Sequence, residues 1–278
     1  MFPHLSDRAK AASYYALALG LCFAVSFAMR SAGEGAAVVA MLTPLTAVLL
    51  MQLVVTRDGR TRAGWAGLGL RHAAFRVWPI AIALPVAILA ASEGVVALTG
   101  LTHGDVSALP GAPDLAIGAV VTALFCLGEE IGWRGYLLPL LQRDGRPAPA
   151  LRTGFLHGLW HLPIVFVVPG AYLTDGNRWL TVPLFLAVLT TAGALYGWLR
   201  DVSGSIWPAV VTHGAFNFVL NIAVDTRPTN DLDTVALIGH ETGVATLGLL
   251  VLSAVFLSAT RRTPAPRGAE PAPVALAG

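Results

Sequence analysis

Long apolar runs recur along almost the whole chain, and their length limits the possible folds more than any other feature. An α-helix needs about 20 apolar residues to cross the hydrocarbon core of a bilayer, which is about 30 Å thick. The sequence therefore predicts an all-α, polytopic membrane helix bundle with about eight transmembrane helices. The runs span approximately residues 12–30, 36–55, 77–99, 114–141, 151–168, 180–199, 205–224 and 234–259.

The composition excludes an ordinary soluble domain and a nucleic-acid-binding protein. Of the 278 residues, 55% are hydrophobic and only 12% are charged, whereas a soluble domain has about 25% charged residues. The net charge is only +2, and the basic residues lie in loops and at the ends of the runs instead of forming a basic stripe. We therefore expect a multi-pass protein of the cell membrane, surrounded by lipids, with no nucleic-acid partner.

The fifth run is short and contains Pro163, so seven spans plus a re-entrant segment is an alternative to eight. The charge distribution favours eight. If the N-terminus is cytoplasmic, most Lys and Arg residues outside the spans are cytoplasmic too, including those of the 56–76 loop, and only Arg30, Arg178 and Arg227 are outside. This is the bias of the positive-inside rule, and it predicts an N-in, C-in bundle.

Two adjacent carboxylates, Glu129 and Glu130, interrupt the fourth run. An ionised carboxylate near the bilayer centre costs at least about 2.5 kcal/mol, so each needs a partner or a function. Arg134 follows Glu130 by four residues, which places both on one helical face as an ion pair. Glu129 is rotated about 100° from Glu130 and has no basic partner in its own helix, which makes it the better candidate for chemistry.

Two further spans carry polar residues at about the same depth as Glu129. His161 lies in the fifth run, where Pro163 is expected to break the helix and open space around the ring; His213 and Asn217 share one face of the seventh. For each histidine alone, a hydrogen bond between helices is a sufficient explanation. A carboxylate with two imidazoles can also activate water, either directly or around a divalent metal.

His157 precedes His161 by one helical turn and could extend this set. The spacing matches the two histidines of a zinc-protease helix, but Gly158 stands where that motif has its general-base glutamate. As a metal motif on its own, the pair is weak.

In this order, the three clusters resemble the motifs of the CPBP family, which comprises type II CAAX prenyl endopeptidases and related bacterial Abi proteins. The resemblance covers roughly residues 120–220. It departs from the family where His157 replaces an aromatic residue four positions before the histidine of the second motif. The motifs read Glu129-Glu130-Ile131-Gly132-Trp133-Arg134, Gly158-Leu159-Trp160-His161-Leu162-Pro163 and His213-Gly214-Ala215-Phe216-Asn217.

The resemblance implies an intramembrane endopeptidase in which Glu129 activates the attacking water with His161. His213 and Asn217 would stabilise the oxyanion, and Glu130, Arg134 and His157 would support the site. Family members are commonly described as metalloproteases, and the sequence leaves open whether Glu129, His161 and His213 hold a divalent metal such as zinc. The implied partners are peptide or protein substrates, including lipidated or membrane-embedded ones.

The sequence also predicts the domain organisation. Residues 1–260 should form a single transmembrane domain with its catalytic core at about 114–224. Residues 261–278, rich in Pro and Ala, should form a disordered cytoplasmic tail.

Two other functions remain open at this point. One is a noncatalytic immunity or scaffold protein of the same family, which keeps these residues as structural pairs. The other is a proton-coupled transporter, since Glu and His at the midplane also serve as proton relays. The transporter is the weaker candidate, because the sequence shows no paired half repeats and only one polar cluster.

The orientation is testable by protease protection. A protease added to intact cells should leave the 56–76 loop uncut, because the loop is predicted to be cytoplasmic, and should cut it once the membrane is permeabilised. Cleavage of that loop in intact cells would refute the N-in orientation.

Overall fold

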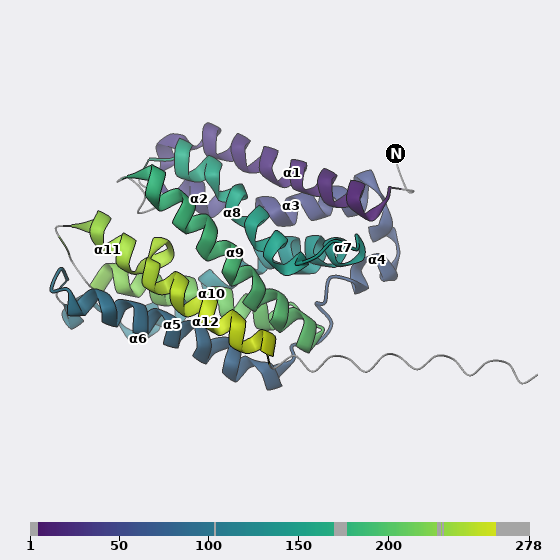
Figure 1. Cartoon of the computed structure of the whole chain (residues 1–278). Coiled ribbons are helices and arrows are strands. Elements are labelled where there is room, and N and C mark those ends of the chain that lie inside the picture. Colours follow the sequence, from purple (N-terminus) through teal and green to yellow (C-terminus); the bar gives the residue numbers. More distant parts are fainter. Residues whose placement is uncertain (1–4, 103, 170–176, 227–228, 230, 260–278) are drawn as a thin grey trace, which may run out of the picture.

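The computed structural model describes residues 5–102, 104–169, 177–226, 229 and 231–259, and this part of the chain is helical without any strand. The long helices lie side by side along a common direction (Figure 1). The helices are α1 (Asp7–Ala28), α2 (Glu34–Ala40), α3 (Thr43–Leu50), α4 (Arg62–Ala66), α5 (Trp78–Leu98), α6 (Ala112–Glu130), α7 (Leu138–Arg143), α8 (Pro149–Val167), α9 (Arg178–Ser203), α10 (Trp207–Thr226), α11 (Leu232–Ile238) and α12 (Val244–Ala259).

Helix covers most of every predicted span, and the predicted polytopic membrane helix bundle is confirmed. α8 and α10 are 19 and 20 residues long, and α12 has 16. The predicted tail, residues 261–278, lies outside the described residues. Five segments are long and apolar enough to cross a membrane by length and composition: Asp7–Ala28, Gly35–Val55, Phe75–Leu98, Ala112–Arg143 and Arg178–Ser203.

The fourth predicted span is one continuous helical segment with an unusual middle. α6 passes into a π-helical segment, Ile131–Leu137, which leads directly into α7. A π-helix hydrogen-bonds each residue to the fifth along instead of the fourth, and such segments are frequent at functional sites. The glutamate pair therefore lies at the change from one helical geometry to the other.

The break expected at Pro163 is wrong. α8 continues through Pro163 to Val167, so the helix extends beyond His161 in both directions. Proline removes one helix hydrogen bond, but packed transmembrane neighbours can compensate for the loss locally. His161 therefore lies within a helix and not at the end of one.

The eighth predicted span, 234–259, is not one helix. It is divided into α11 and α12 by a turn in which His240 adopts a left-handed conformation, with φ 57°. The His240 Nδ1 atom lies 2.7 Å from Oε1 of Glu93 in α5, and both side chains are buried. Gly239 and Gly243 flank the turn, and glycine favours helices poorly. The periodicity of apolar residues does not reveal a break held by such a buried pair.

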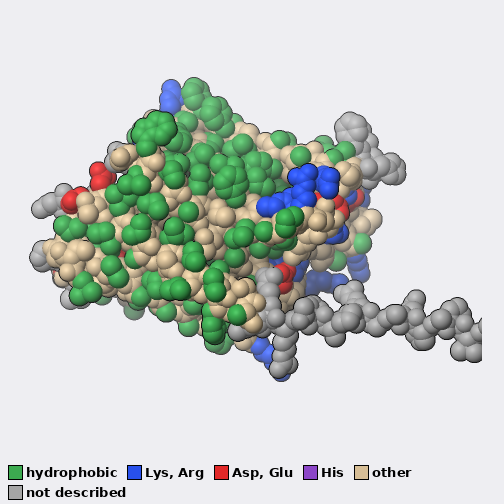
Figure 2. All heavy atoms as spheres, in the orientation of Figure 1, with side chains coloured by type: hydrophobic (Ala, Val, Ile, Leu, Met, Phe, Trp, Pro, Cys, Tyr) green, Lys and Arg blue, Asp and Glu red, His purple; other side chains and the backbone are tan. Residues whose placement is uncertain are grey.

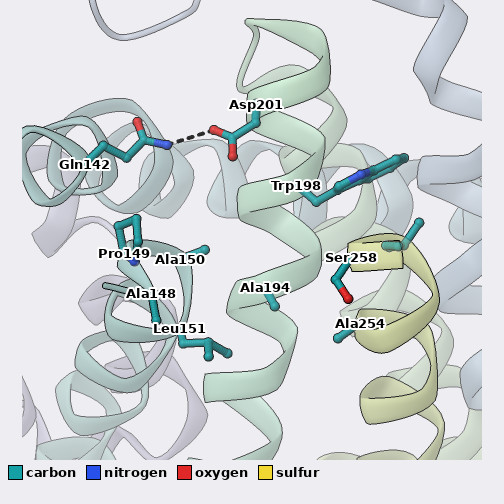
Figure 3. Close-up of a pocket in the computed structure, with 11 residues that line it drawn as sticks. Gln142, Ala148, Pro149, Ala150, Leu151, Ala194, Trp198, Asp201, Ala254 and Ser258 are labelled. Carbon is teal, nitrogen blue, oxygen red and sulfur yellow. Dashed lines mark hydrogen bonds between the residues drawn. The ribbon is translucent and has the colours of Figure 1, made fainter. Parts of the chain in front are cut away.

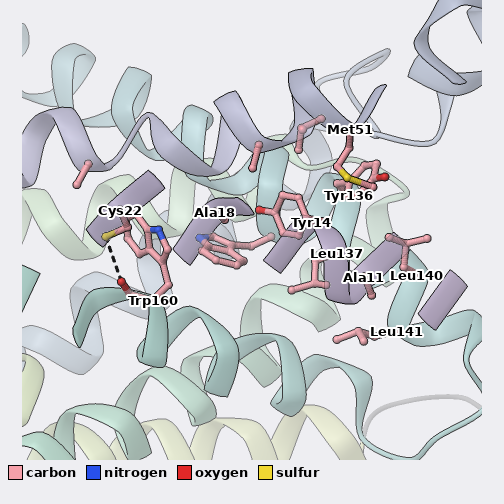
Figure 4. Close-up of a cluster of buried hydrophobic side chains, with 14 of the residues drawn as sticks. Ala11, Tyr14, Ala18, Cys22, Met51, Tyr136, Leu137, Leu140, Leu141 and Trp160 are labelled. Carbon is pink, nitrogen blue, oxygen red and sulfur yellow. Dashed lines mark hydrogen bonds between the residues drawn. The ribbon is translucent and has the colours of Figure 1, made fainter. Parts of the chain in front are cut away.

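Two clusters of buried apolar side chains hold the bundle together. The first joins α1, α3, the π-helical segment, α7 and α8, and its centre is aromatic (Figure 4). Trp133 packs edge-on against Tyr14 and Trp160, with ring centroids 5.9 and 5.7 Å apart. The second cluster joins α5, α9, α10 and α12. His157 and His161 come from α8, which contributes to the first cluster, and His213 and Asn217 come from α10, which contributes to the second.

α8 and α9 approach each other most closely at two glycines. A Cβ built on Gly154 would lie 2.9 Å from the Cα of Gly193, and a Cβ on Gly193 would lie 2.6 Å from the Cα of Gly154. Because both obstacles are backbone atoms, no side-chain movement could relieve the clash. Small residues at such crossings allow the close backbone packing on which helix association in lipid depends.

Apolar and charged side chains lie on different parts of the surface along the bundle. Hydrophobic side chains cover the middle of the face seen in Figure 2, and most of its Lys and Arg side chains gather at the end where α4 and α7 lie. At that end Lys10 Nζ contacts Asp58 Oδ2 at 2.7 Å, and this hydrogen bond lowers the pKa of the Asp58 carboxyl group. An apolar belt with a basic end is the distribution that the positive-inside prediction requires.

The glycine contact gives a stability prediction. Gly193→Ala should destabilise the protein by about 1–3 kcal/mol, the usual cost of overpacking. Thermal unfolding in detergent would measure this as a lower apparent Tm. Gly20→Ala is the matched control: it lies within α1 and its Cβ would meet nothing within 4 Å, so it should be neutral or stabilise by up to about 1 kcal/mol. Equal effects of the two substitutions would contradict the close approach.

Candidate active site

Glu129 and Glu130 lie inside the bundle, with 1% and 0% of their surfaces exposed. The π-helical segment follows them directly, so they are not at a solvent-facing helix end. Gly132 lets this turn pack against α3, because a Cβ there would lie 2.6 Å from Cβ of Pro44. Because both carboxylates are buried, they depend on partners within the protein.

Glu130 belongs to a buried charge network that joins three segments. Its Oε1 atom accepts a hydrogen bond from Arg134 Nη1 at 2.9 Å and lies 2.9 Å from His213 Nδ1 of α10. The Arg134 guanidinium lies 4.5 Å above the ring of Tyr196 of α9, and the His213 ring stacks on the same tyrosine with centroids 5.6 Å apart. The predicted pair of Glu130 and Arg134 is therefore present, and it includes His213.

Glu129 takes its partner from α8. Its Oε2 atom lies 2.7 Å from Nε2 of His157, and both side chains are 1% exposed. One turn further, Nδ1 of His161 donates to the backbone carbonyl of His157 at 3.0 Å. Because a carbonyl oxygen can only accept, Nδ1 of His161 carries a proton, and in the neutral ring the lone pair lies on Nε2.

Glu129, His157 and His161 form a compact set of metal-binding groups. Each offers one ligand atom, and these atoms lie within 4.8 Å of one another. The set expected from the sequence contains His213 in place of His157. In the structure, His213 is bonded to Glu130, and its ring centroid is 5.7 Å from that of His157, against 4.9 Å for His161. The described residues thus bring His157 into the position expected for His213.

Asn217 lies one turn along α10 from His213 and also faces α6. Its amide donates to Sγ of Cys126 at 3.7 Å, and Cys126 is itself one turn before Glu130. Asn217 is half-buried, whereas His213 is buried. The amide therefore lies beside the Glu130 network.

The site also contains two aromatic residues, Tyr196 and Trp133, whose roles were not expected from the sequence. Tyr196 supports both Arg134 and His213, and Trp133 packs on His157 with ring centroids 4.9 Å apart. Aromatic residues are common throughout membrane spans, so residue type alone does not separate these two from lipid-facing ones. The available signal is weak: Tyr196 carries a polar group within a mostly apolar run.

Several polar atoms of the charge network have hydrogen-bonding capacity left over. Among the described residues, Oε2 of Glu130 and both Nε and Nη2 of Arg134 are buried and make no hydrogen bond. Unpaired buried polar groups are costly, and native proteins keep few of them. These atoms are available to a polar ligand that enters the site.

A pocket of about 210 Å³ lies elsewhere, between the α7–α8 turn, α9 and α12. Figure 3 shows Gln142 and Asp201 across it, joined by a hydrogen bond of 2.8 Å. None of the residues that line this pocket belongs to the glutamate and histidine networks. The candidate active site is therefore identified by its glutamate and histidine side chains and not by this pocket.

Comparison with known proteins points to the same region of the chain as the candidate active site. Residues 111–219 match the family model described as type II CAAX prenyl endopeptidase Rce1-like. The chain is also 29% identical over 110 residues to CAAX prenyl protease 2 of Methanococcus maripaludis, a match that covers 38% of this chain and 40% of that protein. The predicted resemblance is thus confirmed over a range that includes all three motifs. Together with the apolar helices, it indicates an integral membrane protein with a protease-like region.

The charge network gives a second stability prediction. Arg134→Met should destabilise the protein by about 3–5 kcal/mol, because it removes one partner of a buried ion pair. Adding Glu130→Gln should restore much of the stability, since the remaining charge is removed as well. Thermal unfolding in detergent would measure both effects.

Arg152→Met is the control for this comparison. Arg152 pairs with Asp144 outside the bundle core, with 29% of its side chain exposed, and loss of such a pair costs less than about 1 kcal/mol. An Arg134→Met protein as stable as the Arg152→Met protein would show that the network contributes little.

Proposed function

We propose that this protein is an intramembrane endopeptidase of the CAAX prenyl protease type, which hydrolyses a peptide bond with water activated by Glu129 and His161. The observation that carries the proposal is the convergence of Glu129, His157 and His161 in the bundle interior, within the range matched to the endopeptidase family. The matched relative is named a CAAX prenyl protease. A buried carboxylate beside two imidazoles has the chemistry that peptide hydrolysis requires.

Glu129 and His161 have complementary parts in activating water. The Glu129 carboxylate takes one proton as the water oxygen attacks the peptide carbonyl, and it returns this proton to the departing amine. His161 accepts a hydrogen bond from the same water at Nε2, because its Nδ1 proton is held by the carbonyl of His157. His157 orients the Glu129 carboxylate through their 2.7 Å contact.

His213 and Asn217 would stabilise the oxyanion that forms on the peptide carbonyl. Asn217 can donate from its amide directly. His213 is more restricted, because its Nδ1 proton is directed at Glu130. Donation from Nε2 therefore needs the doubly protonated ring, whose positive charge the Glu130 carboxylate would balance. In this proposal Glu130 and Arg134 act on the reaction only through His213.

The substrate class follows from the resemblance and from the site's position. A peptide or protein that is lipidated or lies in the membrane could reach a site inside a helix bundle from the surrounding lipid. With the N-terminus in the cytoplasm, the substrate would arrive from the cytoplasmic side of the cell membrane. A C-terminal prenylated CAAX peptide is the first substrate to test.

One observation favours the noncatalytic alternative. Glu129 already has a protein partner at 2.7 Å, and Glu130 has two at 2.9 Å, so both carboxylates can serve as structural pairs in a scaffold or immunity protein. The two functions differ in their dependence on Glu129. Replacing its negative charge by a neutral amide of the same shape removes the base but keeps the side-chain volume.

Cleavage of a quenched fluorescent farnesylated CAAX peptide by purified protein in nanodiscs tests the proposal. Glu129→Gln should lower kcat at least about 100-fold, the usual contribution of a general base, while thermal unfolding shows that the variant is folded. Glu93→Gln is the matched control, because it changes a buried glutamate of the bundle that lies outside the site, and it should retain cleavage. Full activity in Glu129→Gln would contradict the mechanism, and cleavage of the unprenylated peptide alone would contradict the substrate class.

A further inference from the structure

The π-helical segment Ile131–Leu137 contains a backbone carbonyl that lacks its usual partner. In π-helical pairing, a carbonyl accepts a hydrogen bond from the N–H group five residues along. For Arg134 that residue is Pro139, which has no N–H group. The N–H group of Leu138, one residue earlier, is bonded to the carbonyl of Trp133. In this pairing the backbone of the segment therefore offers the Arg134 carbonyl no donor.

Arg200 supplies a donor from α9. Its Nε atom donates to the carbonyl of Arg134 at 3.3 Å, and its Nη2 atom donates to the carbonyl of Gly67 at 3.0 Å. Arg200 lies in the last turn of α9 and is half-buried. The planar guanidinium can serve both carbonyls at once, because its donors point in fixed and different directions. It thus joins α9, the 56–76 loop and the π-helical segment.

The 56–76 loop leaves room for the guanidinium because residue 69 is glycine. A Cβ built on Gly69 would lie 2.8 Å from both Cζ and Nη2 of Arg200, and the φ of Gly69 is +76°, which other residues rarely adopt. The loop also packs closely on the π-helical segment, since a Cβ on Gly135 would lie 3.2 Å from the carbonyl oxygen of Leu68. The guanidinium therefore has a defined place between the two.

The hydrogen bond from Arg200 favours the π-helical form over the α-helical one. Pro139 removes one backbone donor in either form. The carbonyl that loses its partner is that of Arg134 in a π-helix and that of Gly135 in an α-helix. A buried carbonyl without a partner is costly. Because Arg200 donates to the Arg134 carbonyl, it compensates for the proline in the π-helical form.

We propose that Arg200 is a positioning residue, which holds the π-helical segment in the geometry that the active site needs. The segment begins directly after Glu130 and contains Arg134, whose side chain pairs with Glu130 at 2.9 Å. Arg200 reaches this segment through a backbone carbonyl, so it acts on the reaction through the positions of these two side chains. Its effect on catalysis rests on the proposed function, whereas its effect on the helix does not.

Hydrogen exchange measured by mass spectrometry tests the inference without any substrate. The reporter is a peptide that contains the amide of Leu138, which is bonded to the carbonyl of Trp133. In nanodiscs, Arg200→Gln should speed exchange of this peptide about tenfold, because the loss of a hydrogen bond to a buried carbonyl makes local opening easier. Ser205→Ala is the matched control. It removes a hydrogen bond of 2.6 Å from Ser205 to the carbonyl of His72 in the same loop, and exchange of the reporter peptide should stay as in the wild type.

Pro139→Ala completes a double-mutant cycle with Arg200→Gln. Alanine restores an N–H group, which can bond to the Arg134 carbonyl in the π-helical form or to the Gly135 carbonyl in the α-helical form. In either form the segment no longer needs a donor from Arg200. In the Pro139→Ala background, Arg200→Gln should therefore speed exchange by about twofold or less.

Cleavage of the farnesylated CAAX peptide connects the helix to the reaction. Arg200→Gln should lower kcat by about tenfold or more and leave KM unchanged, because it displaces side chains of the site and is not expected to bind the substrate. The assay temperature should be well below the Tm of the variant, so that unfolding does not contribute. Ser205→Ala should keep both kcat and KM.

Several results would overturn the proposal. They are unchanged exchange in Arg200→Gln, equally fast exchange in Ser205→Ala, and an undiminished effect of Arg200→Gln in the Pro139→Ala background. Faster exchange with unchanged kcat would refute the positioning role. If Arg200→Gln does not fold, Arg200→Lys replaces it: a single ammonium lacks the planar fork, so exchange of the reporter peptide should still be faster than in the wild type, and unchanged exchange would refute the proposal. If the wild type does not cleave the peptide, the proposed function fails, while the exchange measurements still decide whether Arg200 holds the segment.

Discussion

The structure depends on one constraint: two carboxylates buried side by side in a bundle surrounded by lipid must be balanced by the protein itself. The two carboxylates are balanced by different partners. Glu130 is balanced within its own helical segment by Arg134 and then by His213 of α10, whereas Glu129 reaches His157 of α8. The requirement to satisfy both therefore ties three segments of distant sequence together at one depth. The same convergence creates the only kind of place in a lipid-surrounded bundle where charged side chains, histidines and a polar ligand can meet.

The networks around Glu130 and Glu129 differ in the chemical groups that they offer to a reaction. The one around Glu130 contains a fixed positive charge and is packed on Tyr196, which suits it to hold geometry. The one around Glu129 contains imidazoles, which can exchange protons. Adjacent residues of the same type thus acquire different chemistry from a rotation of about 100° between them. This division is the reason that the first carboxylate is the reactive one in the proposed function.

Much of this arrangement could be predicted from sequence, and the failures have physical reasons. Helix positions followed from apolar run length, and the bond between Glu130 and Arg134 followed from a spacing that depends on one helix alone. The partner of Glu129 could not be predicted from the sequence, because it depends on how α6 and α8 pack. The spacing of His157 and His161 was recognised, but sequence gives no distance to a carboxylate on another helix. Pro163 and the turn at His240 were misjudged for the related reason that tertiary contacts override local helix preferences.

The π-helical segment Ile131–Leu137 has a consequence for how relatives of this chain can diverge. A π-helical turn accommodates an additional residue relative to an α-helical one, so deletion of a single residue there would convert the segment to ordinary α-helix. The residues beyond it would keep their rotation relative to Glu129, because the deletion removes the same residue that the wider turn accommodates. A deletion in the ordinary α-helix on either side would instead rotate everything beyond it by about 100° and separate Arg143 from Asp7. The π-helical segment is therefore the place in this stretch where relatives can gain or lose one residue while α7 keeps its position.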